Sequence, residues 1–112
     1  MVCYWNETGI SKRFLDELQA YCRENESVEK VILFGSRARG DHRNTSDIDL
    51  ALVTNDLSHS KQNLIEEDIY NMSTPLRIDI LFLDRLSKEK LISNIWNEGV
   101  IIYEKGKALR EA

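Results

Sequence analysis

The segment 47–53 alternates acidic or small residues with the apolar residues Ile48, Leu50 and Leu52. A period of two is the signature of a β-strand with one buried face. A strand has no independent stability, so other segments of the chain must pair with it. Apolar segments of strand length occur at 28–34, 76–83 and 100–103. The sequence therefore predicts a sheet as the centre of the fold.

Helical periodicity occurs beside these strands. Apolar spacings of three and four residues predict helices at about 11–25, 61–72 and 87–97. Ser11 is the predicted N-cap of the first helix, Pro75 ends the second, and Gly99 is the predicted C′ residue of the third. The residues expected on the buried faces are Phe14, Leu15, Leu18, Tyr21, Cys22, Leu64, Ile65, Ile69, Met72, Leu91, Ile92, Ile95 and Trp96.

The order helix, strand, strand, helix, strand, helix, strand predicts an α/β or α+β fold, with a mixed sheet flanked by helices. The 112 residues are the size of one compact domain, expected over 1–112 with its core at about 28–103. Apolar residues make up 42% and charged residues 30%, a balance that argues against disorder.

Several functional classes are disfavoured by composition. The longest apolar runs are about four residues, far short of the roughly 18 that cross a bilayer, and no secretory leader opens the chain. The net charge of −4 argues against nucleic acid as a main partner, because non-specific binding rests on a basic surface. Cys3 and Cys22 are too few for a secreted disulfide scaffold, and Cys22 is expected in the core as a reduced thiol. We expect a cytoplasmic protein.

A glycine and a serine follow the first predicted strand. Gly35 permits a close approach of the backbone, and Ser36 offers a hydroxyl at the start of a short helical turn. Such a turn can bind phosphate through its N–H groups, with Arg37, Arg39 and Arg43 screening the charge. An ordinary turn with solvated arginines is the alternative interpretation. No GxxxxGK[ST] pattern occurs, so this is not a Walker loop.

Two acidic residues begin the alternating strand. Asp47 and Asp49 project from one face, because residues i and i+2 of a strand point the same way. Asp79 lies inside a later apolar strand, where a solitary charge is costly. If the two strands pair, three carboxylates converge, and a pair of Mg²⁺ ions would compensate their charge. Solvated acids, with Asp79 paired to Arg77, are one alternative, and a structural Ca²⁺ or Mg²⁺ site is another.

The pattern Gly35-Ser36, ten residues, Asp47-Ile48-Asp49 resembles that of the DNA polymerase β-type nucleotidyltransferase superfamily, in particular its minimal branch, the MNT proteins. The third carboxylate of that family matches Asp79, and the resemblance covers about 31–103. It implies the polymerase β-type fold and transfer of a nucleoside monophosphate from ATP or another nucleoside triphosphate. Two Mg²⁺ ions and release of pyrophosphate are part of that implied reaction.

Position by position, the resemblance implies nucleotide-binding roles for Gly35, Ser36 and Arg37. In the implied site Gly35 and Ser36 bind the β- and γ-phosphates, and the third acid also helps to deprotonate the acceptor. The metal-ligating and catalytic residues that it implies are Asp47, Asp49 and Asp79.

Stand-alone MNT proteins are similar to the antitoxins of MNT/HEPN toxin–antitoxin pairs. This similarity implies transfer of AMP to a tyrosine of a helical HEPN partner, which silences the toxin. The stretch after Tyr103 is too short for an acceptor-binding domain, so a partner is expected to bring the acceptor. A non-catalytic antitoxin that neutralises its partner by occlusion stays open as the alternative. Outside the motif, His42 and His59 are expected at the surface, and Ile101 and Tyr103 in the core, with an interface as the alternative for these two.

Overall fold

In the computed structural model of the protein, residues 5–55 and 57–106 are described. The strands and helices predicted from periodicity are all present, within a few residues of their expected bounds. Two short 3₁₀ helices, η1 and η2, were not predicted. The elements in chain order are η1 (Trp5–Thr8), α1 (Lys12–Glu24), β1 (Val28–Phe34), α2 (Ser36–Arg39), β2 (Ile48–Thr54), α3 (His59–Tyr70), β3 (Ile78–Phe82), η2 (Leu83–Arg85), α4 (Glu89–Glu98) and β4 (Val100–Glu104).

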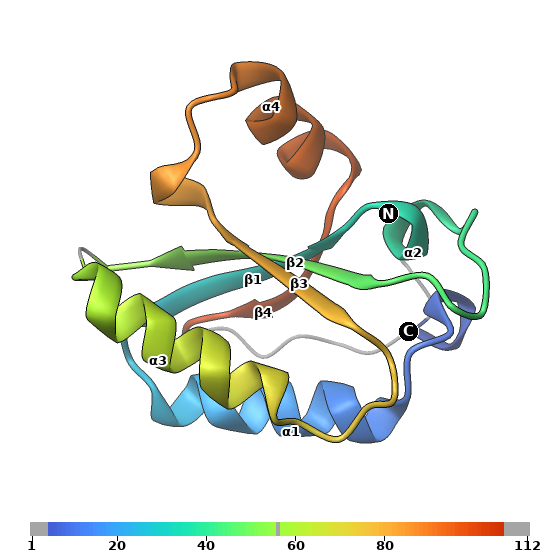
Figure 1. Ribbon diagram of the computed structural model, residues 1–112, viewed down its shortest axis with the longest axis horizontal. Helices are drawn as coiled ribbons and strands as arrows, with labels where there is room; N and C mark the ends of the chain where they lie inside the picture. The colour runs from blue at the N-terminus through green and yellow to red at the C-terminus, as the bar shows by residue number, and fades with distance from the viewer. Residues whose placement is uncertain (1–4, 56, 107–112) are drawn as a thin grey trace.

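The four strands form one mixed sheet in the order β3-β2-β1-β4 (Figure 1). β1 pairs antiparallel with both β2 and β4, and β2 pairs parallel with β3. The parallel pair is possible because α3 carries the chain back to the starting end of the sheet. This arrangement confirms the predicted mixed α/β fold.

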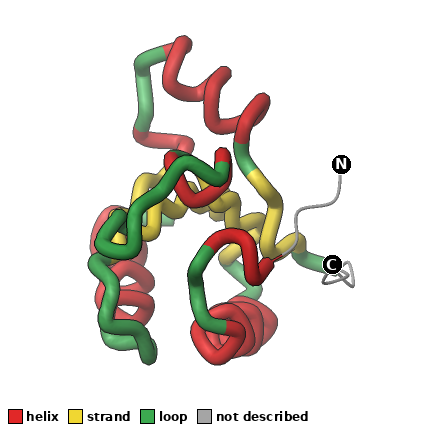
Figure 2. The backbone as a smooth tube through the Cα atoms, turned by 90° about the vertical axis from the view of Figure 1, so that its right-hand side faces the viewer, coloured by secondary structure: helices red, strands yellow, loops and turns green. Residues whose placement is uncertain are grey.

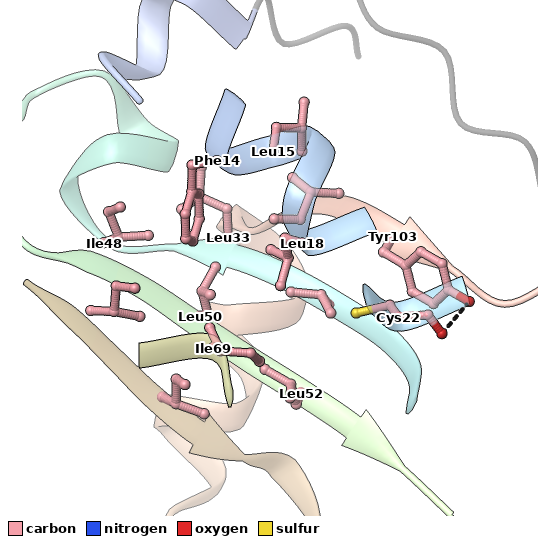
Figure 3. Packing of buried hydrophobic residues seen from close by; sticks show 14 of the residues in the cluster. Phe14, Leu15, Leu18, Cys22, Leu33, Ile48, Leu50, Leu52, Ile69 and Tyr103 are labelled. Carbon is pink, nitrogen blue, oxygen red and sulfur yellow. Dashed lines mark hydrogen bonds between the residues drawn. The ribbon is translucent and has the colours of Figure 1, made fainter. Parts of the chain in front are cut away.

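The main core lies between one face of the sheet and helices α1 and α3 (Figure 1). Phe14 and Leu18 of α1 pack over Leu33 of β1 and the alternating apolar residues of β2 (Figure 3). The Tyr103 hydroxyl donates to the carbonyl of Cys22, 3.2 Å away, which ties β4 to α1. Both Cys22 and Tyr103 are buried, as predicted, whereas Cys3 lies outside the described residues.

Helix α4 covers the opposite face of the sheet (Figure 2). A small second cluster forms there around Ile32, Ala51 and Ile95. Asp49 precedes Ala51 by two residues, so its side chain emerges on this same face. The carboxylates predicted from the sequence therefore lie on the α4 side, away from α1 and α3.

The helix ends follow local sequence signals. The Ser11 hydroxyl caps α1 by accepting a hydrogen bond from the N–H of Phe14 at 3.1 Å, as predicted. Ser58 caps α3 in the same way, through the N–H of Lys61. Gly99 ends α4 as its C-cap, one residue before the predicted C′ position, with an extended backbone at φ −74°. Space is the reason for glycine there, because a Cβ would collide with Ile32 of β1.

Two predictions of burial on the helices are wrong. Leu64 of α3 is 62% exposed, and Gln62 is buried on this helix together with the predicted residues Ile65 and Ile69. Trp96 of α4 is 46% exposed, and its ring lies beside the ammonium of Lys30. In both helices the predicted residue Ile65 or Ile95 is buried, and the residue adjacent to it along the chain points outward, because successive side chains of a helix are about 100° apart.

A third prediction of burial is wrong in the last strand, β4, at the edge of the sheet. Ile101 is 40% exposed, which contradicts its predicted burial. A bulge shifts the register between β1 and β4 near this residue, and Ile102 and Tyr103 enter the main core instead. Within residues 5–55 and 57–106, no helix has the length and apolarity to cross a membrane.

Candidate active site

The turn after β1 brings the glycine and serine to the carboxylates. Gly35 has φ +76°, a conformation that L-residues with a side chain rarely adopt, and α2 begins at the next residue, Ser36. A Cβ added at Gly35 would overlap the carboxylate of Asp49. The backbone of the turn and this carboxylate are therefore in direct contact.

Strand pairing sets the positions of two of the acids. Asp49 of β2 and Asp79 of β3 are direct partners in the parallel register, so their side chains leave the same face side by side. Asp47 precedes β2, and the N–H of the next residue, Ile48, donates to the carbonyl of Arg77 at 2.8 Å. Convergence of the acids was expected if these two strands pair, and the observed parallel register brings Asp49 and Asp79 together.

The three carboxylates affect one another electrostatically. Burial raises the pKa of Asp49, and the negative charges of Asp79 and Asp47 raise it further. Burial also raises the pKa of Asp79, together with a hydrogen bond and the charge of Asp47. Ionisation of these neighbouring carboxylates is therefore unfavourable in the folded chain, and a bound cation would offset their repulsion.

Two exposed arginines provide part of the compensation. The positive charge of Arg39 on α2 opposes the rise in the pKa of Asp49. Its guanidinium also pairs with Asp41 at 3.2 Å and with Glu98 at 3.8 Å. Arg77 lies 3.8 Å from Asp79 and is 79% exposed. The pairing of Arg77 with Asp79, considered above as an alternative, therefore exists together with the acid cluster.

Arg37 has a different environment from the one the sequence predicts for a phosphate-binding side chain. It is 2% exposed, and its guanidinium donates to backbone carbonyls of η1 and of the loop before β2. A contact between Arg37 and a nucleotide would have to come from its backbone N–H. Sequence reasoning missed this buried position, which a charged residue rarely occupies.

The two histidines differ in their exposure to solvent. His59 is exposed at the start of α3, as predicted. His42 is half-buried, and its Nδ1 atom is buried without a hydrogen-bond partner, so its predicted surface position is wrong in part.

A cavity of about 330 Å³ lies between α1 and α3, with Tyr21, Leu64 and Asp68 in its wall. It is on the other side of the sheet from the acids and separate from them.

The donor set fits divalent cations that prefer oxygen. Asp47, Asp49 and Asp79 supply carboxylate oxygens of the kind that Mg²⁺ takes, with water and substrate phosphates completing its octahedron. Among the described residues no three acidic, histidine or cysteine side chains close on a single metal position. Protein carboxylates alone would therefore not enclose an ion here, and phosphate oxygens would have to share it.

Comparison with known families agrees with this geometry. Residues 16–108 match the family described as "Polymerase beta, Nucleotidyltransferase". The chain belongs to this family. Its matched segment includes the Gly35-Ser36 turn and all three acids, so the polymerase β nucleotidyltransferase resemblance seen in the sequence is confirmed at the level of the family. As a member, the chain is a nucleotidyltransferase.

Two relatives of this nucleotidyltransferase come from Methanocaldococcus jannaschii. One, named as a candidate protein adenylyltransferase, is 28% identical over 94 residues, which are 81% of this chain and 93% of the relative. A second protein with the same functional name is 44% identical over 48 residues, 43% of this chain and 46% of its own length. The first alignment extends over nearly the whole relative.

Solved structures share the fold. A candidate nucleotidyltransferase from Sulfolobus solfataricus has a TM-score of 0.60 at 20% identity, covering 95% of this chain and 92% of that one. A chain of the MntA–HepT toxin–antitoxin complex has a TM-score of 0.61 at 18% identity, covering 85% and 74%. A complex of a tri-AMPylated HEPN toxin with an MNT antitoxin from Shewanella oneidensis gives 0.60 at 18% identity, covering 82% and 71%.

Proposed function

We propose that this nucleotidyltransferase transfers AMP from ATP, with Mg²⁺, to a hydroxyl group of a partner protein. The observation that carries the proposal is the parallel pairing of Asp49 with Asp79 beside the turn at Gly35. The carboxylates of Asp49 and Asp79 lie close together there, beside the backbone of Gly35, where a larger residue would fill the space next to Asp49. A nucleotide triphosphate with its cations supplies both the positive charge and the ligand that such a site lacks.

In the proposed reaction the acceptor oxygen attacks the α-phosphorus of ATP. The bond from that phosphorus to the oxygen bridging to the β-phosphate breaks, and pyrophosphate leaves. Asp79 accepts the proton of the acceptor hydroxyl, while the Gly35 backbone and the Ser36 hydroxyl hold the β- and γ-phosphates. The rate enhancement comes mainly from orientation of the in-line attack.

The three acids have the remaining roles in this proposal. Asp47 and Asp49 would hold both Mg²⁺ ions, and Asp79 would complete the site of the catalytic one. When bound, the ions neutralise the charge that develops on the transferred phosphate and the leaving group. Ionised carboxylates are needed for this, and the raised pKa of Asp49 and of Asp79 means that the cation-free site disfavours their ionisation.

We further propose that the acceptor is a tyrosine of a HEPN-type partner and that the chain acts as its cytoplasmic antitoxin. Support comes from the fold shared with an MNT antitoxin complex whose HEPN toxin is tri-AMPylated, and with a toxin–antitoxin complex containing AMP-PNP. The names of the two archaeal relatives also point to transfer onto protein. A nucleoside triphosphate is thus the proposed small substrate.

Occlusion without catalysis is the second candidate. The observation in its favour is that four large apolar side chains among the described residues are exposed, on elements that lie on both sides of the sheet. These residues are Leu64, Tyr70, Trp96 and Ile101. In this alternative the helical partner is neutralised by contact alone, and the carboxylates are dispensable.

The test uses ATP labelled on the α-phosphate, Mg²⁺ and lysate of the source organism, beside the double variant Asp47→Asn, Asp49→Asn. We expect one labelled protein band with the wild type, no band with the double variant, and none with ATP labelled on the γ-phosphate. Label on RNA would contradict the protein acceptor, and absence of label with every nucleotide would contradict catalysis. Full neutralisation of the identified partner by the double variant would support occlusion.

A further inference from the structure

The Arg37 guanidinium is buried in the described structure without a carboxylate partner. Arg37 is 2% exposed, and no ion pair found between the described residues includes it. A buried charge without hydrogen bonds would be strongly unfavourable, so its donors must be satisfied in another way. The other arginine of α2, Arg39, is exposed to solvent and to acids.

Backbone carbonyls satisfy the guanidinium. Its Nε donates to Ser46 at 3.0 Å and its Nη1 to Thr8 at 2.8 Å. Its Nη2 donates to Arg43 at 3.3 Å and to Asn44 at 3.2 Å. We call this set of contacts the Arg37 clamp. It uses the planar fork of donors that arginine has and lysine lacks.

The chain around the clamp is adapted to it. Gly9 follows Thr8 with φ +71°, and a Cβ there would come within 2.7 Å of Nη1 of Arg37 and 2.9 Å of Nε2 of His42. The Thr8 hydroxyl donates to the carbonyl of Trp5 at 2.6 Å and thereby closes the η1 turn. The segment before α1 is thus folded so that a carbonyl reaches the guanidinium.

The clamp acts on the residue that precedes Asp47. Ser46 is held by Arg37 from α2, and its N–H also donates to the carbonyl of Arg43 at 3.0 Å. Ile48, on the other side of Asp47, is held by the carbonyl of Arg77. The backbone is therefore held by hydrogen bonds on both sides of Asp47. The hydrogen bond on the Ser46 side comes from Arg37 of α2, the helix that begins at Ser36.

We propose that Arg37 is a positioning residue for Asp47, which sets the distance between the Gly35-Ser36 turn and the first acid. The guanidinium itself does not bind the nucleotide. This inference rests on the proposed function, in which Asp47 is a metal ligand. Fixed backbone near a ligand carboxylate determines how well that carboxylate can hold an ion, in the way that outer hydrogen bonds tune metal sites.

The test compares Arg37→Met and Arg37→Lys with Arg23→Met, which removes an exposed charge from α1, on the other side of the sheet from the acids, and leaves the clamp intact. Nucleotide binding is measured with ATP, first without metal and then with increasing Mg²⁺. We expect both Arg37 variants to raise the Mg²⁺ concentration at half-saturation about tenfold or more, with unchanged binding of metal-free ATP. Hydrogen exchange of residues 43–48 should accelerate in the same two variants only.

Other results of these measurements would contradict the proposal. A parallel loss of metal-free ATP binding in Arg37→Lys would show that the guanidinium contacts the nucleotide, and unchanged Mg²⁺ dependence would show that the clamp does not position Asp47. Should the wild type bind no ATP at any Mg²⁺ concentration, the proposed function fails, while unchanged hydrogen exchange at 43–48 overturns the clamp separately. If Arg37→Met does not fold, Gly9→Ala displaces the clamp while keeping the guanidinium, and the same shift in Mg²⁺ dependence is expected.

Discussion

The carboxylate of Asp49 occupies the space where a side chain on Gly35 would begin. Asp49 lies in β2, and Gly35 follows the neighbouring antiparallel strand β1, whose last residue, Phe34, is the register partner of Asp49. Glycine at this position therefore serves the acid as well as the turn. This relationship joins the two halves of the sequence motif into one site.

Substitution of Gly35 by alanine should abolish Mg²⁺-dependent ATP binding, because the new Cβ displaces the Asp49 carboxylate. Gly40→Ala is the matched control, because Gly40 also has a positive φ, +88°, but no atom lies within 4 Å of the added Cβ. Gly40→Ala should lose about 1–2 kcal/mol of stability from backbone strain, and Gly35→Ala should lose more, because its Cβ also overlaps Asp49. Calorimetric titration with ATP and Mg²⁺ then separates them. Retained Mg²⁺-dependent ATP binding in Gly35→Ala would contradict a role for the contact between Gly35 and Asp49 in the site.

Replacing Asp49 by asparagine should raise the melting temperature of the metal-free protein at neutral pH. The pKa of Asp49 lies above its ordinary value of 3.8, so the charged form is less stable in the folded chain than in the unfolded one. This cost grows as pH rises through the interval between the unfolded and folded pKa. The gain in Asp49→Asn should therefore be larger at pH 7 than at pH 4.

The same Asp49→Asn variant should lose the stabilisation that Mg²⁺ and ATP give to the wild type. Glu67→Gln, a change at an exposed acid of α3, is the control for removal of one negative charge. Differential scanning calorimetry at both pH values, with and without Mg²⁺ and ATP, measures all of these effects. Equal shifts in the two variants would indicate a general charge effect rather than one specific to the acid cluster.

Removal of the Ser36 hydroxyl should weaken ATP binding by about 1 kcal/mol, the value of one hydrogen bond, with an intact fold. Ser60→Ala, on the exposed first turn of α3, is the matched control. Isothermal titration with ATP and Mg²⁺ measures both dissociation constants. An unchanged constant in Ser36→Ala would mean that this serine only completes the turn.

Two neighbouring residues of α3 should respond oppositely to truncation. Ile65 is 2% exposed in the main core, so Ile65→Ala should cost about 2–5 kcal/mol of unfolding free energy. Leu64 is 62% exposed, and Leu64→Ala should change stability by less than about 0.5 kcal/mol. Urea denaturation measures both. A large loss in Leu64→Ala would contradict the observed orientation of the helix.

The sequence predicted the strands, the helices and the spacing of the motif, because periodicity and turn chemistry depend on residues close together in the chain. Ser11 illustrates this, since its capping contact spans three residues. The separation between Gly35-Ser36 and Asp47 was also visible. These local signals were sufficient to indicate the family and to propose the acids, whose catalytic roles remain predictions.

Only the tertiary structure decided which distant residues meet and which faces are buried. Asp79 joins Asp49 because β2 and β3 pair in one parallel register, and a shift of one residue would turn either carboxylate to the opposite face. Arg37 is buried because carbonyls from two separate segments surround its guanidinium. Trp96 is exposed because α4 docks through Ile95. Pairing register and helix docking are set by contacts across the whole fold, which no local pattern encodes.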